Sequence, residues 1–152
     1  MLLKNWLLGG VVGSLVYFFV GWVVHDMFLK EFLVAHGGLT PSAMRTESLT
    51  LYSLAGYTFL GFLLTYLLLR THLQEGLSAL VFGGLFGLLL RGAVLMQVYA
   101  TTTVYSKTGL AADLITFSII SSLAAVAIRM VTGFAEQPIT LENESPEIEW
   151  PQ

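Results

Sequence analysis

Long runs of apolar residues, separated by short polar stretches, make up most of this chain. Four such runs stand out, at residues 5–24, 48–69, 76–98 and 110–133. Each is long enough to cross a bilayer as a helix, which takes about 20 residues at 1.5 Å per residue. The pattern therefore predicts an all-α integral membrane protein, a four-helix transmembrane bundle whose neighbouring helices run antiparallel.

The stretches between and after these runs predict the rest of the organisation. Residues 25–36, HDMFLKEFLVAH, place apolar pairs and charges at helical spacing, which predicts either an extension of the first helix or a segment lying in the membrane interface. Residues 136–152 hold five acids, three prolines and no base, as an acidic solvated tail would. We expect a transmembrane domain over residues 1–133 and a separate acidic tail over 134–152.

Composition supports the membrane class. Apolar residues make up 55% of the chain and charged residues 11%, whereas about a quarter of an ordinary soluble domain is charged. The chain has no cysteine, which excludes disulfides, thiol redox chemistry and thiolate metal sites. Nothing in the sequence points to nucleic acid. We read the first run as a retained helix, because it is longer than a signal-peptide core and lacks a small-x-small cleavage pattern.

Small residues recur along two of the predicted helices. In the first, Gly9, Gly13 and Gly21 share one helical face with Tyr17. Small side chains at this spacing let helix backbones approach closely in lipid, so we expect these glycines to be packing positions.

The third run repeats this pattern and adds a charge. Gly76, Ala79, Gly83, Gly87 and Arg91 follow one another at steps of three or four residues, so they share a face. We expect Gly83 and Gly87 to pack against protein, and Arg91 to lie on the same protein-facing side, where an intramembrane charge survives.

Arg91 is the candidate intramembrane polar site. An uncompensated arginine near mid-membrane costs about 2.5–3.5 kcal/mol, so a carboxylate partner is expected, and Asp26 and Asp113 lie at matching depth. Gln97 follows on the same helix as a further polar candidate. Two interpretations stay open: a structural ion pair or an arginine reaching the headgroups, and a functional group that binds an anion or carries part of a proton path.

Catalytic, metal and haem chemistry find no support in the residue pattern. His25 and His72 follow successive antiparallel helices and are therefore expected on opposite faces of the membrane, and His36 lies in the first loop. We interpret all three as interfacial histidines. The serines of the apolar runs have no histidine at matching depth to act as a base, and no lysine lies in mid-span. We expect a protein that is not an enzyme, with no metal and no catalytic residue.

The chain resembles a family of small bacterial inner-membrane proteins defined by a domain of unknown function. The resemblance rests on KNWLLGGVVGSLVYFFVGWVV, on Met44-Arg45, on TFLGFLLTYLLLR and on GLSALVFGGLFGLLL, and it covers residues 4–133. It implies a four-helix protein of the bacterial inner membrane and brings no catalytic residues. Arg91 and the acidic tail depart from the family pattern.

Three functions remain open. The first is an accessory or stabilising subunit of a larger membrane complex, bioenergetic or photosynthetic, surrounded by the bilayer and by other subunits. In this hypothesis the tail docks on a partner outside the bilayer through its apolar residues, which are Ile139, Leu141, Ile148 and Trp150. The second is a small homo-oligomeric transporter or channel that uses Arg91 for an anionic solute. The third is a protein that binds a lipid, quinone or pigment between its helices, with no other cofactor predicted.

Because short N-termini usually stay inside, we expect cytoplasmic termini.

Overall fold

The computed structural model describes residues 2–36, 50–71, 76–102 and 105–134, and all its regular elements there are helices. The helices are α1 (Leu2–Trp22), the π-helix η1 (Val23–Leu29), α2 (Lys30–Ala35), α3 (Thr50–Thr71), α4 (Gly76–Thr101) and α5 (Lys107–Phe134). The expected all-α class is confirmed for this part of the chain. The proposed tail domain, with Ile139, Leu141, Ile148 and Trp150, lies outside the described residues.

Within the described residues, four helices are long and apolar enough to cross a membrane, as the hydrophobic pattern predicts. The first does not stop at residue 24: α1, η1 and α2 form one continuous helical segment, with Leu3–Ala35 as the candidate span. Of the two possibilities for residues 25–36, extension of the first helix is the one observed. The reason is local, since these residues carry neither proline nor glycine to break the helix.

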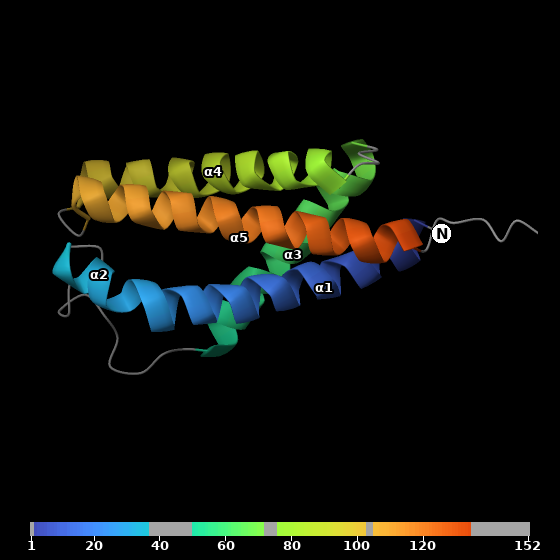
Figure 1. The fold of residues 1–152 in the computed structure, drawn as a ribbon, viewed down its shortest axis with the longest axis horizontal. Helices are drawn as coiled ribbons and strands as arrows, with labels where there is room; N and C mark the ends of the chain where they lie inside the picture. The colour runs from blue at the N-terminus through green and yellow to red at the C-terminus, as the bar shows by residue number, and fades with distance from the viewer. Residues whose placement is uncertain (1, 37–49, 72–75, 103–104, 135–152) are drawn as a thin grey trace, which may run out of the picture.

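The helices do not pack in a closed ring. α1 packs against both α3 and α5, and α4 packs mainly against α5, whereas α3 and α4 barely touch. Figure 1 shows α4 and α5 side by side, α1 along the other flank of α5, and α3 crossing at a steep angle. The packing order is therefore α3–α1–α5–α4, and the α3–α4 side is open.

Glycines set the closest approach between α4 and α5. A Cβ atom on Gly83 would lie 2.5 Å from the Ala125 Cβ and from the Ser121 carbonyl oxygen. A Cβ atom on Gly87 would come similarly close to the Ser121 side chain. The Ser118 hydroxyl donates to the carbonyl oxygen of Gly84 at 2.7 Å. We call this contact the α4–α5 seam. It is a close small-residue contact of the kind that holds membrane helices together.

The glycines of α1 occupy the other side of the bundle. A Cβ on Gly9 would lie 2.6 Å from Thr65 Cγ2, and one on Gly13 would lie 2.8 Å from Ile128 Cδ1. One on Gly21 would meet the Tyr57 hydroxyl at 3.4 Å, an ordinary contact distance. The glycine face of α1 thus lies against α3 and α5.

A tyrosine hydrogen bond ties α1 to the middle of α5. Tyr17 is fully buried, and its hydroxyl donates to Ser121 Oγ at 2.9 Å. Its ring stacks on Phe117, with centroids 5.8 Å apart. Because the phenol finds an acceptor, its burial leaves no unsatisfied hydroxyl, and α1 is held in register with the seam.

Candidate functional site

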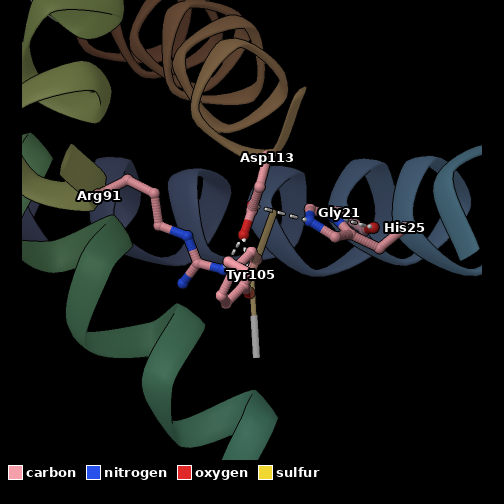
Figure 2. Close-up of polar contacts among 5 residues, drawn as sticks. All are labelled: Gly21, His25, Arg91, Tyr105 and Asp113. Carbon is pink, nitrogen blue, oxygen red and sulfur yellow. Dashed lines mark hydrogen bonds and ion pairs between the residues drawn. The ribbon is translucent and has the colours of Figure 1, made fainter. Parts of the chain in front are cut away.

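A buried carboxylate is the centre of the polar site. Asp113 lies on the second turn of α5 and is 1% exposed. The Arg91 Nη2 group on α4 donates to Asp113 Oδ2 at 2.8 Å, and the Tyr105 hydroxyl donates to the same oxygen at 3.2 Å. Figure 2 shows these side chains converging on the carboxylate from separate segments. Asp113 is one of the two partners expected for Arg91, and the structure places the two side chains in contact.

His25 completes this group. It lies in the π-helix η1, and its Nε2 atom is 3.5 Å from Asp113 Oδ1. Its other ring nitrogen, Nδ1, lies 3.2 Å from the Gly21 carbonyl oxygen. Asp113, Arg91, Tyr105 and His25 are called the Asp113 cluster below. A π-helix is uncommon and is often found at functional sites.

His25 is predicted from the sequence as an interfacial histidine, and its contact with Asp113 is not among the predicted contacts. A signal was present, because His25 lies four residues after Gly21 and continues the spacing of Gly13, Tyr17 and Gly21 along one helical face. That spacing predicts that His25 points into the bundle, provided that the helix continues past the predicted end at residue 24.

The local fold around residue 106 positions Tyr105. Ser106 caps α5, its hydroxyl oxygen accepting from the Gly109 N–H at 3.1 Å, and the same hydroxyl donates to the carbonyl of His36 at the end of α2. Serine is a favoured residue for this capping role. Burial is the largest cause that raises the pKa of the Tyr105 phenol above its ordinary value, and the negative charge of Asp113 raises it further. Tyr105 therefore stays protonated at neutral pH and donates to the carboxylate.

Arg91 is held in place, but Asp113 does not use all of its N–H donors. Its guanidinium lies 5.4 Å from the centre of the Phe117 ring, within cation–π range. Its Nε atom is buried and has no hydrogen-bond partner among the described residues. Figure 2 shows one terminal nitrogen directed to Asp113 and the other turned away. Since a guanidinium has five N–H donors, Arg91 retains donors beyond those that Asp113 uses.

An open cavity of about 530 Å³ adjoins this cluster between α3 and α4. Its lining residues are His25, Ser53, Gly56, Tyr57, Leu60, Leu90, Arg91, Val94 and Phe117. Among these, His25, Ser53, Tyr57 and Arg91 carry polar groups, and the other side chains are aliphatic or aromatic. We call it the α3–α4 cavity. Its volume lies within the range of about 300–1,000 Å³ that is typical of small-molecule sites.

Of the other predicted polar residues, the structure describes the side chain of Gln97 but not that of Asp26. Gln97 is exposed on α4, and its backbone carbonyl accepts from the Thr101 hydroxyl at 2.8 Å, so it is not part of the cluster. Asp26 belongs to η1, but its side chain is not among those described. Within the described ranges, no three residues of the His, Cys, Asp or Glu types come together to form a metal site.

Comparison with known protein families, with curated proteins and with solved structures gives no match for this chain.

Proposed function

We propose that this chain is a non-enzymatic, multi-pass membrane protein that binds an amphiphilic molecule of the lipid, quinone or pigment class in the α3–α4 cavity. One observation carries the proposal: a cavity of about 530 Å³ with basic side chains at one place and apolar walls elsewhere, opening between two helices. Such a cavity matches a molecule with a polar headgroup and an apolar body.

The outer surface supports a lipid-embedded protein. Large apolar side chains are widely exposed on all four long helices, for example Phe19 at 57%, Phe59 at 76% and Leu89 at 63%. Exposure on this scale favours a lipid environment, because apolar surface of this extent is unfavourable in water. A cavity that opens between two such helices is accessible from the hydrocarbon core.

The polar end of the cavity supports a specific headgroup contact. Arg91 and His25 both line the cavity, and their side chains are 32% and 29% exposed. The Asp113 side chain is 2% exposed, and its contacts with both basic side chains hold them in position. A guanidinium fixed by a carboxylate is a preorganised donor, and preorganisation lowers the cost of binding.

The test is extraction of the bound molecule from protein purified in mild detergent, followed by mass spectrometry. Gly56→Leu is the informative variant, because Gly56 lines the cavity and a Cβ there meets nothing within 4 Å. A Cβ atom there clashes with nothing, and we expect the longer leucine side chain to take up cavity volume. Gly76→Leu is the matched control, since Gly76 also faces open space but does not line the cavity.

We expect a stoichiometric amphiphile with the wild type and with Gly76→Leu, and its loss with Gly56→Leu. Equal recovery from all three proteins, in the proportions of bulk membrane lipid, would contradict the proposal.

A second candidate is an accessory or stabilising subunit of a larger membrane complex in the bacterial inner membrane, with its termini in the cytoplasm. It is favoured by the open α3–α4 side, which a helix of another subunit would fit. Blue-native electrophoresis of mildly solubilised membranes tests it: migration with a larger complex supports the candidate, and migration as a monomer or small homo-oligomer contradicts it. A small transporter or channel for an anionic solute has no observation of its own in its favour among the described residues.

A further inference from the structure

The charges of the Asp113 cluster are arranged unequally around the cavity. The two basic side chains, Arg91 and His25, line the cavity wall, whereas Asp113 does not. Asp113 lies behind them, almost wholly buried. A headgroup that enters the cavity therefore meets the bases first, and this favours an acceptor or an anion over a cation.

The hydrogen bonding of His25 adds a second observation. Nδ1 faces the Gly21 carbonyl and Nε2 faces the Asp113 carboxylate, and both of these groups only accept hydrogen bonds. A neutral imidazole carries one N–H and satisfies one of them, whereas an imidazolium carries two and satisfies both. An imidazolium at this position would therefore direct one N–H toward each acceptor.

Charge balance links these two observations. With a neutral His25, Arg91 and Asp113 cancel, and the cluster is neutral. Protonation of His25 alone leaves one net positive charge among apolar helices, which is unfavourable unless a counter-charge is present. An anionic headgroup in the cavity supplies that counter-charge.

Building on the function proposed above, we infer that the α3–α4 cavity takes an amphiphile with an anionic headgroup and that His25 takes up one proton from solvent when it binds. The headgroup stays ionised, contacts Arg91 and lies beside the new imidazolium. No covalent bond changes. The cluster and its ligand are neutral together, as the empty cluster is.

His25 is the group in this site suited to such a change. The described titratable and charged groups that share the cluster or the cavity with it are Asp113 of α5, Arg91 of α4, Tyr105 before α5 and Tyr57 of α3. Arginine and tyrosine keep their protons well above neutral pH, and Asp113 is ion-paired with Arg91. Histidine changes charge between about pH 5 and pH 8.

The experiment measures binding of two probes to the full chain in nanodiscs of zwitterionic lipid. The probes are an alkyl sulfonate, which keeps its negative charge throughout this pH range, and a neutral alkyl amide of the same chain length. Nanodiscs that carry the Gly56→Leu variant give the background from partition into lipid. Specific binding is the difference between the two.

We expect specific binding of the sulfonate to weaken by up to about tenfold for each pH unit raised between about pH 5 and pH 8, because one proton is taken up with it. The amide should bind more weakly and without this pH dependence. His25→Gln should abolish the pH dependence, whereas His36→Gln, on an exposed histidine away from the cavity, should retain it.

The outcomes separate this inference from the proposed function. Specific binding of both probes to equal extents, or sulfonate binding that is independent of pH, would overturn the inference and leave an amphiphile site. No specific binding of either probe would overturn both. Competition by an anionic phospholipid added to the nanodiscs would support the inference and identify a lipid headgroup as the source, and its absence would point to a free anionic amphiphile.

Discussion

α4 faces α5 on one side and α3 on the other, and only the side toward α5 is closely packed. Toward α5, glycines and serines bring the backbones into direct contact along the α4–α5 seam. Toward α3, a cavity of about 530 Å³ separates the helices. One helix thus forms both a close contact and an opening. The opening is therefore not a general failure of this sequence to pack, and this contrast is the basis of the ligand proposal.

The Asp113 cluster lies where these two regions meet. Arg91 continues the glycine face of α4 beyond Gly87, and its guanidinium reaches Asp113 on one side and lines the cavity on the other. Phe117 likewise belongs to the buried core and to the cavity wall. The fixed seam therefore sets the position of the groups that a ligand would meet.

The largest expected effect comes from removing the carboxylate. Asp113→Ala leaves the Arg91 charge without its partner among apolar helices, and breaking a buried pair in this way costs about 3–5 kcal/mol. We expect the lower end of that range, because Arg91 is 32% exposed. The measurement is reversible unfolding in mixed micelles. The double variant Arg91→Met with Asp113→Ala should recover much of the loss, and a double variant as unstable as the single one would contradict this account of the ion pair.

A smaller loss of stability is expected when a methyl group is added in the α4–α5 seam, and no loss when one is added at the α3–α4 cavity. Gly83→Ala places a Cβ 2.5 Å from Ala125 Cβ and the Ser121 carbonyl oxygen, so the seam must open, at about 1–3 kcal/mol. Gly56→Ala, opposite α4 across the cavity, meets nothing within 4 Å. We expect it to change stability by less than about 1 kcal/mol, in the stabilising direction. Equal destabilisation by both variants would remove the contrast between seam and cavity.

The smallest effect should come from the hydrogen bond between α1 and the seam. Tyr17→Phe removes the hydroxyl that donates to Ser121 Oγ at 2.9 Å. Side-chain hydrogen bonds between membrane helices contribute about 0.6 kcal/mol on average, and we expect a loss of that order in the same unfolding assay. Tyr52→Phe, at a tyrosine that is 73% exposed, is the control and should show no change.

Much of the fold could be predicted because it depends on composition along the chain. The four apolar runs give four long helices, and the steps from Gly76 to Arg91 place Gly83 and Gly87 on the face that the structure puts against α5. The Arg91 partner could be narrowed to Asp26 and Asp113, because depth in a span follows from counting residues.

The rest depends on features that residue counting does not contain. The contact of His25 with Asp113 follows from the spacing along the first helix only if that helix continues through η1, beyond its predicted end at residue 24. The cavity depends on which helices pair, and the order α3–α1–α5–α4 is set by side-chain shapes rather than by chain order. For these reasons the sequence predicts a polar residue in the membrane but not the space beside it.

The most direct test of the central claim is to locate a bound amphiphile by photo-crosslinking. The wild-type chain in nanodiscs is illuminated with an alkyl sulfonate that carries a diazirine, and the modified residues are mapped by mass spectrometry. We expect adducts that are concentrated on the cavity residues Leu60, Val94 and Phe117 and are lost in Gly56→Leu. Adducts spread over outward-facing residues such as Phe59 and Leu89, and unchanged in that variant, would contradict it.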